Sequence, residues 1–222
     1  MDEAGNPGRH EAVEAAIFFL AKLGVSRFPL EPEKIIPRMG WGLKTYAWLA
    51  GVEGVTDWGD LSDMGHSVFS STDAMICRKG GKYLIAYNHK VRPYGRMNFS
   101  LMHEVGHIVL GHLDSLRPGS FPPPRFSGEL LRRWDREADC FASNTLAPAI
   151  LAKQFQATLT PGECRWIFRM SQAAWSTRLS LLRQDYALVT AERREAQRRQ
   201  YGEFVKLVES RKGSIVGRVI KV

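Results

Sequence analysis

The segment SLMHEVGHIVLGHLD, which begins at Ser100, places two histidines and a glutamate inside an apolar run. Leu101, Val105 and Ile108 recur at helical spacing and Gly111 follows as a stop signal, so we predict a largely buried helix. Polar and charged side chains are costly to bury unless a partner satisfies them. This helix must therefore pack where hydrogen bonds or a metal ion can satisfy its polar groups.

The pattern HExxH in this helix predicts a zinc site. Residues four apart on a helix project from nearly the same side, so His103 and His107 can both meet one ion. Glu104 lies about 100° around the helix, where it can act as catalytic general base on zinc-bound water without being a ligand. The alternative is a pair of core histidines satisfied by hydrogen bonds, but that alternative leaves Glu104 without a partner.

A catalytic zinc site usually has three protein ligands, and the helix predicted in ELLRRWDREADCFASNTLAP offers the third. Its inward stripe is expected to comprise Leu130, Trp134, Ala138, Phe141 and Thr145, with Pro148 marking the end of the helix. Glu137 lies on the border of that stripe, whereas Asp139 lies on the far side and Asp135 borders the opposite edge. Glu137 is the predicted ligand, and a surface pair with Arg133 is the alternative.

The remaining periodicity predicts a chain rich in helices with one hairpin. Near the N-terminus we expect an opening helix that ends at Gly24 and a short helix in EPEKIIPRMG. Strands are expected near 74–78 and 82–88, around a turn at 79–81. Two short helices are expected in 161–184, meeting at the N-cap Ser171. Residues 41–65 carry no clear pattern, and 113–127, which include FPPPRF, are predicted as a long surface loop. The strand KYLIAYN is either an edge along which a peptide substrate aligns or an ordinary paired strand.

Composition and charge narrow the setting. Hydrophobic residues make up 44% and charged residues 24%, as in globular proteins. The three cysteines are far apart and form no CxxC pair. No stretch approaches the roughly 20 apolar residues of a membrane span. The N-terminus is unlike a signal peptide. We therefore expect a cytoplasmic protein without membrane contact.

Over half of the net charge of +8 lies near the C-terminus, because residues 188–222 hold nine Lys/Arg and four Asp/Glu. This segment is either a solvated helix with a frayed end or a surface that attracts nucleic acid or an acidic partner. The stretch MSQAAWSTRLSLL has helix-turn-helix character, and DNA phosphates could meet Arg165, Arg169, Arg178 and Arg183. DNA binding is the less favoured prediction, because Trp175, Leu179 and Leu182 fall at core spacing.

Several weaker candidates accompany the metal site. His112 lies about 140° around the helix from His107, so it is predicted as a core histidine or as support for a ligand. Structural or rim roles are expected, with stabilisation of an oxyanion as the alternative, for Tyr87, Asn88, His89 and Tyr94. Cys140 is expected to be a buried, inert thiol.

The segment YLIAYNHKVRPYGRMNFSLMHEVGHIVLGH, followed by READCFASNTLAP, resembles the ImmA/IrrE family of bacterial zinc metallopeptidases. The family pattern runs from an apolar strand ending in Tyr-Asn, through an Arg and a Phe, to HExxH. A helix with Glu-Ala-Asn/Asp-x-Phe-Ala and a proline follow. LAKLGVSRFPLEPEKII and SQAAWSTRLSLL also resemble its flanking segments, so the resemblance covers about residues 11–184.

The resemblance implies an α+β, zincin-like metallopeptidase domain, mostly helical with a small sheet, plus a C-terminal helical segment. It implies His103, His107 and Glu137 as ligands of Zn2+, with Glu104 as base of a gluzincin-like metallo-endopeptidase. The expected substrate is a cognate helix-turn-helix transcriptional repressor. The alternative is a regulatory or toxin-antitoxin binding protein that docks a repressor or DNA, but a binding site alone does not need Glu104.

The expected organisation has three parts: the metallopeptidase domain in 1–148, a helix-turn-helix-like subdomain in 149–185 packed on it, and a basic tail in 186–222. The segment after Asp185 has no counterpart in the family pattern, and residues 41–65 are unusually rich in aromatics and glycine. Both departures affect which binding partner is expected, and they leave the predicted metal chemistry of HExxH unchanged. Ligation by two histidines and a glutamate also suits manganese or iron.

Overall fold

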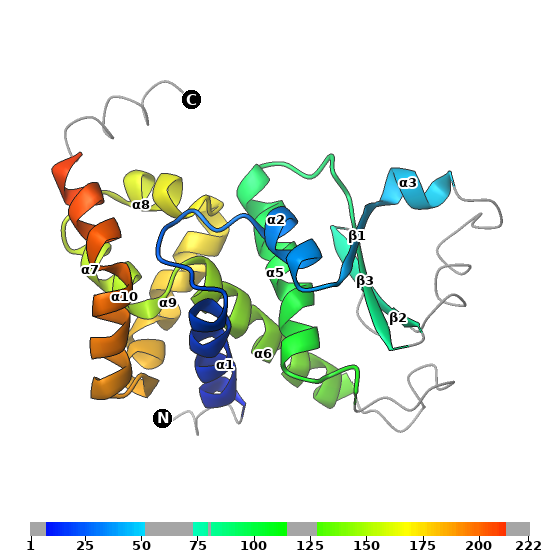
Figure 1. Ribbon diagram of the computed structural model, residues 1–222, viewed down its shortest axis with the longest axis horizontal. Helices are drawn as coiled ribbons and strands as arrows, with labels where there is room; N and C mark the ends of the chain where they lie inside the picture. Colours follow the sequence, from blue (N-terminus) through cyan, green and yellow to red (C-terminus); the bar gives the residue numbers. More distant parts are fainter. Residues whose placement is uncertain (1–7, 52–72, 80, 115–127, 212–222) are drawn as a thin grey trace. The chain divides into compact units, whose positions relative to one another are not determined.

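The computed structural model describes residues 8–51, 73–79, 81–114 and 128–211 (Figure 1). The chain forms two compact units, one of residues 31–142 and the other of residues 1–30 together with 143–222. This division differs from the predicted boundaries at 148 and 185, because the first helix packs with helices near the C-terminus. Helices predominate and the described sheet has three strands, so the predicted α+β class, mostly helical with a small sheet, is confirmed.

The unit of residues 31–142 carries the sheet. Its elements in chain order are α2 (Pro32–Arg38), β1 (Gly42–Thr45), α3 (Tyr46–Ala50), β2 (Ala74–Lys79), β3 (Lys82–Tyr87), α5 (Tyr94–Val109) and most of α6 (Gly128–Leu146). The strand order is β1-β3-β2, with β3 antiparallel to β2 and parallel to β1. The predicted hairpin is confirmed, and Gly81 has a φ of 76°, a conformation that glycine adopts without strain.

The central position of β3 corrects one prediction. Leu84–Tyr87 pairs with β1 on one side and with β2 on the other. A central strand has no unpaired edge to which a peptide can add hydrogen bonds. The hypothesis that a substrate aligns along KYLIAYN is therefore wrong, and the alternative of an ordinary paired strand is confirmed.

Two polar contacts fix where α5 starts beside the sheet. Arg96 donates from Nε and Nη2 to the two carboxylate oxygens of Asp73, immediately before β2, at 2.5 and 3.0 Å. Glu33 on α2 accepts hydrogen bonds from the hydroxyls of Tyr87 and Tyr94. Charge-assisted pairs of this kind hold geometry well. They keep α5 and α2 against one face of the sheet (Figure 1).

Helix α5 comes very close to α6 at Gly106, which lies between the two histidines of HExxH in the sequence. A Cβ at Gly106 would lie 3.1 Å from Ala138 Cα, 3.2 Å from the Ala138 carbonyl oxygen and 3.2 Å from Phe141 Cδ1. The first two are backbone atoms, which cannot move aside by a change of rotamer. Glycine therefore permits an approach that a larger residue would prevent.

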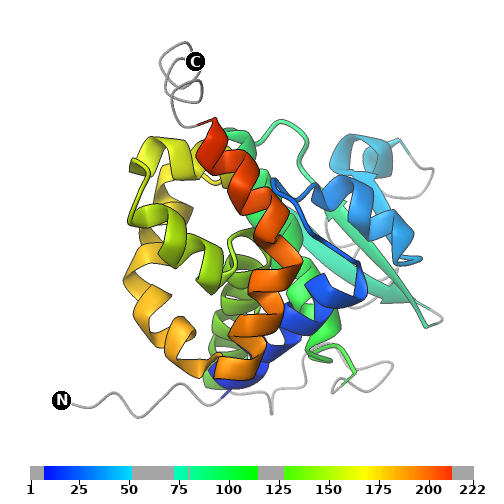
Figure 2. The same ribbon diagram turned by 60° about the vertical axis from the view of Figure 1, so that its left-hand side comes forward.

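The second unit is helical in its described part (Figure 2). Its helices are α1 (Arg9–Lys22), α7 (Ala149–Gln156), α8 (Pro161–Phe168), α9 (Gln172–Leu188) and α10 (Ala191–Ser210). Ser171 caps α9 as predicted, because its side chain accepts a hydrogen bond from the Ala174 backbone nitrogen. The α6 stripe and its end before Pro148 also agree with prediction, with Leu130 partly rather than fully buried.

Helix α10 agrees with the expectation of a helix within the basic segment 186–222, but one side of this helix is buried and not solvated. Its Tyr201 and Phe204 pack their rings against Phe28, with centroids 5.7 Å away in each case. These apolar residues bury one side of the helix, and the basic residues occupy the other positions. Residues 191–210 are therefore part of a folded core, because an amphipathic helix is stabilised by burial of its apolar side.

The structure contradicts the less favoured hypothesis that Arg178 contacts a DNA phosphate. This side chain is fully buried and donates hydrogen bonds to Asp185 at 2.6 Å, Asn144 at 3.1 Å and the Ala147 carbonyl oxygen at 2.8 Å. A guanidinium buried in this way is satisfied by the protein and cannot reach DNA. Trp175 and Leu182 lie in the core as predicted.

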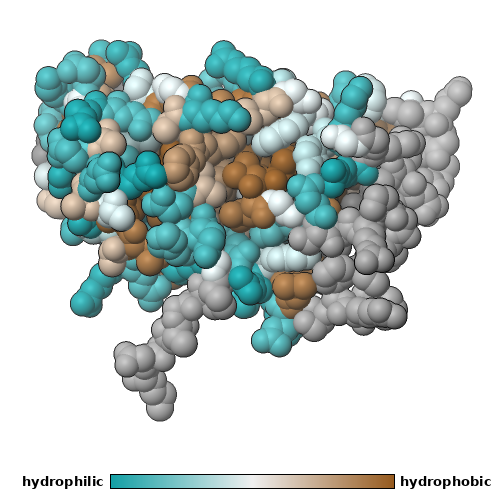
Figure 3. Space-filling view, turned by 60° about the horizontal axis from the view of Figure 1, so that its bottom comes forward, coloured by the Kyte–Doolittle hydropathy of each residue, from teal (hydrophilic) through white to brown (hydrophobic). Residues whose placement is uncertain are grey.

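Some sequence segments fall outside the described residues, namely 52–72, the proline-rich 115–127 and 212–222. The face shown in Figure 3 is largely hydrophilic, with apolar residues gathered in smaller areas. Among the helices described, none combines the length and apolarity that crossing a membrane requires.

The approach at Gly106 predicts the outcome of one substitution. Gly106→Ala gains up to about 1 kcal/mol of helix propensity, but overpacking against backbone costs about 1–3 kcal/mol. We expect a net loss of stability in urea unfolding, together with weaker zinc binding in competition with a chelator. Gly202→Ala in α10 is the matched control, because a Cβ there meets nothing within 4 Å. That variant should gain about 0.5–1 kcal/mol, and equal gains in both variants would contradict the close approach.

Candidate metal centre

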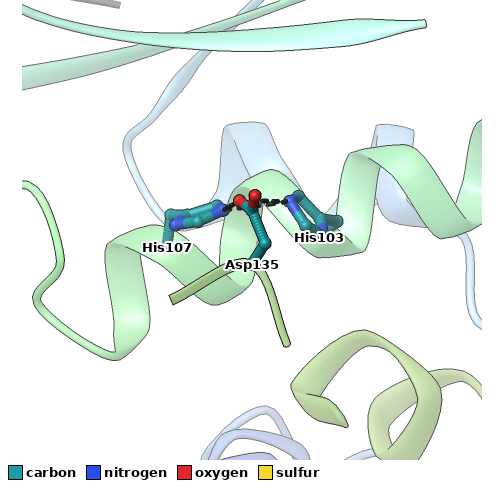
Figure 4. Close-up of side chains that lie close together, drawn as sticks. All are labelled: His103, His107 and Asp135. Carbon is teal, nitrogen blue, oxygen red and sulfur yellow. Dashed lines mark hydrogen bonds and ion pairs between the residues drawn. The ribbon is translucent and has the colours of Figure 1, made fainter. Parts of the chain in front are cut away.

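His103 and His107 lie one turn apart on α5 and face the same side, as predicted (Figure 4). Their Nε2 atoms are 2.9 Å apart. Asp135 on α6 points between them, with Oδ1 3.6 Å from His107 Nε2 and 3.9 Å from His103 Nε2. Among the described residues, these three side chains form the group whose ligand atoms all lie within 4.8 Å of one another.

This geometry fits a divalent metal ion. Ligands about 2.0–2.2 Å from zinc in a tetrahedral arrangement stand about 3.3 Å from one another. The separations here, 2.9, 3.6 and 3.9 Å, lie on either side of that value. Three protein ligands leave a fourth position open, as in catalytic rather than structural zinc sites. The same donors also suit manganese and iron, so the donor set supports a divalent ion without selecting zinc.

The structure brings Asp135, and not Glu137, to the two histidines. Glu137 is buried, but its Oε2 lies 3.0 Å from His112 Nε2 and its Oε1 accepts a hydrogen bond from Arg133 Nε at 2.7 Å. The pairing with Arg133 is the alternative that the sequence had left open. Glu137 as a direct ligand remains a prediction that this arrangement does not support.

Asp139, which the helical wheel placed on the far side of α6, also belongs to the site. Its Oδ1 lies 2.7 Å from His103 Nδ1, the ring nitrogen that faces away from the ligand group. Asp135 and Asp139 are four residues apart, as His103 and His107 are, so each pair shares one side of its helix. This shared i, i+4 spacing was the signal in the sequence for both aspartates.

The second histidine has a different partner. His107 Nδ1 lies 2.9 Å from His112 Nδ1, and the His112 ring stacks on Trp134 with centroids 5.2 Å apart. Burial, with help from the neighbouring histidines, lowers the pKa of His107 well below its usual value. Burial also lowers the pKa of His112, although Glu137 opposes this effect. Both rings are therefore neutral at pH 7, as a metal ligand must be.

His103 has the opposite tendency. Burial acts to lower its pKa, but the hydrogen bond with Asp139 and the charges of Glu104, Asp139 and Asp135 outweigh burial and raise it. Burial raises the pKa of Asp135, with His103 opposing. The carboxylates around His103 therefore favour its protonated form in the metal-free protein, and a metal ion would take the place of that proton.

Glu104 is the other buried carboxylate of the site, with 2% of its surface exposed. Its Oε2 has no hydrogen-bond partner among the described residues. Burial raises the pKa of Glu104 to about 8, although the neighbouring His103 opposes this. A buried carboxyl group without a partner destabilises the fold when it is ionised, and a pKa near neutrality suits a group that accepts and returns a proton.

The weaker candidates have structural roles or lie apart from the ligand group. Asn88 accepts a hydrogen bond from the Lys90 backbone nitrogen at 3.0 Å, and His89 is exposed. Tyr87 and Tyr94 bind Glu33, as described above. Cys140 is buried, forms no disulfide and lies outside the ligand group.

Comparison with models of known protein families found no match for the chain, and comparison with curated proteins found none either. The chemistry of the site therefore rests on its own side chains. These are two imidazoles and a carboxylate that suit a divalent ion, and a fourth side chain, Glu104, that suits proton transfer.

The buried Glu104 predicts a dependence of stability on pH in the metal-free protein. Its pKa rises from 4.5 to about 8 on folding, so its contribution is fully present below pH 4.5 and is lost as pH rises through 8. Glu104→Gln removes this loss. In urea unfolding with a chelator present, we expect the variant to exceed wild type at pH 9 by on the order of a few kcal/mol, with a smaller difference at pH 5.

The control for that experiment is Glu209→Gln on the exposed part of α10. A surface change of this kind should alter stability by no more than about 0.5 kcal/mol at either pH. Parallel stability curves for wild type and Glu104→Gln between pH 5 and 9 would show that Glu104 is not a destabilising buried acid.

Proposed function

We propose that the chain is a metal-dependent endopeptidase of the ImmA/IrrE type. The observation that carries this proposal is the position of Glu104. This residue is buried beside two histidines whose Nε2 atoms converge, and its Oε2 has no hydrogen-bond partner in the described residues. A site that only bound metal would have no use for this carboxylate. General base catalysis accounts for its burial and for its raised pKa.

The side chains divide the work as follows. His103, His107 and Asp135 would hold the ion, and Asp139 orients His103 through its Nδ1. A bound divalent ion supplies a Lewis acid that lowers the pKa of water and polarises a scissile carbonyl. Glu104 accepts the proton of the attacking water and returns it to the leaving amine. Glu104 is almost completely buried, whereas Asp135 is about half exposed, so the proposed site is open to water on the side of Asp135.

The zincin-like fold and the substrate class are parts of the same proposal. An HExxH helix against a small sheet, with a carboxylate contributed by the next helix, supports the zincin-like assignment. The resemblance to the ImmA/IrrE pattern supports zinc as the ion and a helix-turn-helix repressor as the substrate. The cysteines are buried and form no disulfide, which agrees with a cytoplasmic, reducing setting.

The first test is metal content. We expect about one zinc per chain by elemental mass spectrometry, and loss of that zinc in His107→Ala. Glu104→Gln should retain the metal, because Glu104 is not a ligand. A folded wild-type protein without metal, even after zinc is added back, would contradict the peptidase and favour a regulatory binding protein.

The second test is cleavage. Glu104→Gln should capture the repressor without cutting it, and wild type should then cleave the captured protein at a discrete bond seen by mass spectrometry. Loss of the general base should slow cleavage by about 10²–10⁴-fold. Metal-loaded wild type that binds the repressor and leaves it intact would support docking without proteolysis.

A further inference from the structure

A continuous set of contacts runs from the surface of α6 to the ligand group. Arg133 Nε donates to Glu137 Oε1 at 2.7 Å, and Glu137 Oε2 lies 3.0 Å from His112 Nε2. His112 Nδ1 then lies 2.9 Å from His107 Nδ1. His107 and His112 are almost completely buried, whereas 42% of the Arg133 side chain is exposed. The chemistry of these groups determines the direction of every hydrogen bond between them.

The direction follows from Glu137. An ionised carboxylate only accepts hydrogen bonds, so His112 must donate from Nε2. A neutral imidazole carries one N–H, which leaves His112 Nδ1 as an acceptor. His107 must therefore donate from Nδ1, and its Nε2 keeps a lone pair. Asp139 imposes the same form on His103 directly, because its carboxylate accepts from Nδ1.

Both histidines thus present Nε2 lone pairs to one point, where the two nitrogens are 2.9 Å apart. Two acceptors this close repel each other unless a proton or a cation lies between them. A divalent ion satisfies both at once, together with Asp135. The hydrogen bonds on the outer sides of the rings therefore prepare the inner sides for metal.

We propose that Arg133, Glu137 and His112 form a positioning relay that holds His107 in the tautomer that binds metal. Glu137 acts on the ion through His112 and not as a ligand. The stacking of His112 on Trp134 fixes the plane of the relay ring, with 14° between the two planes. Removing such support typically weakens metal binding about 10–100-fold while leaving the ligands in place.

The inference depends on the metal centre of the proposed function but not on its peptidase activity. Two substitutions of His112 separate positioning from packing. His112→Phe keeps a ring that can stack on Trp134 but has no nitrogen, whereas His112→Gln keeps one acceptor and one donor. We expect zinc affinity, measured by competition with a chelator, to fall about 10–100-fold in His112→Phe and to stay closer to wild type in His112→Gln.

Glu137→Gln and Asp135→Asn then distinguish relay from ligand. With Co2+ as the probe, Glu137→Gln should bind about tenfold more weakly with an unchanged absorption spectrum, whereas Asp135→Asn should alter the spectrum because a ligand is lost. His89→Gln, at an exposed histidine, is the matched control and should behave as wild type. Nitrogen NMR of the zinc-loaded wild type should show protonated Nδ1 on both His103 and His107.

The outcomes separate the two hypotheses. Wild-type protein without metal would remove the proposed function and the relay together. Wild type that binds metal, with His112→Phe equal to it or better than His112→Gln, would overturn the relay alone and leave a packing role. A changed cobalt spectrum in Glu137→Gln would overturn the relay by making Glu137 a ligand. If His112→Phe fails to fold, as judged by circular dichroism, the comparison of Glu137→Gln with Asp135→Asn still decides.

Discussion

The close approach of α5 to α6 at Gly106 is the constraint on which the site depends, because its side chains come from both helices. The Cα and carbonyl oxygen of Ala138 lie just over 3 Å from the position of a Cβ at Gly106, so the two backbones are close enough that a side chain at Gly106 would crowd α6. At that separation the short carboxylates of Asp135 and Asp139 reach imidazoles on the facing helix. A wider spacing would require longer side chains and a different ligand set.

The acidic residues of α6 divide their roles according to burial. Asp135 and Asp139 have about half of their side-chain surface exposed, at 52% and 55%, and meet the histidines from the open side. Glu137 is buried with Arg133 and His112 behind the site. In the proposed peptidase a substrate would approach from this exposed side, which is consistent with an exposed ligand and a buried supporting residue. The unpartnered oxygen of Glu104 is destabilising for folding and useful for proton transfer.

Much of the local structure was predictable because it depends on neighbours in the sequence. The hairpin follows from two apolar runs around a glycine turn, and the Ser171 cap follows from the chemistry of a helix N-terminus. The burial of one side of α10 was missed because Tyr201 and Phe204 are too few to predict it without knowing that Phe28 is nearby. The burial of Arg178 was missed for a similar reason, because its partners Asn144 and Asp185 come close to it only in the folded chain.

The sequence by itself determined that His103 and His107 share one side of a helix with Glu104 beside them, because helical periodicity alone sets those directions. Only the tertiary structure decided which carboxylate meets them. The burial pattern of α6 favours Glu137, since it lies nearest the apolar stripe. The carboxylate that lies between the two histidines is instead the half-exposed Asp135. Which carboxylate of α6 meets the histidines depends on how α6 is rotated about its axis against α5. The close contact between Gly106 and Ala138 fixes that rotation.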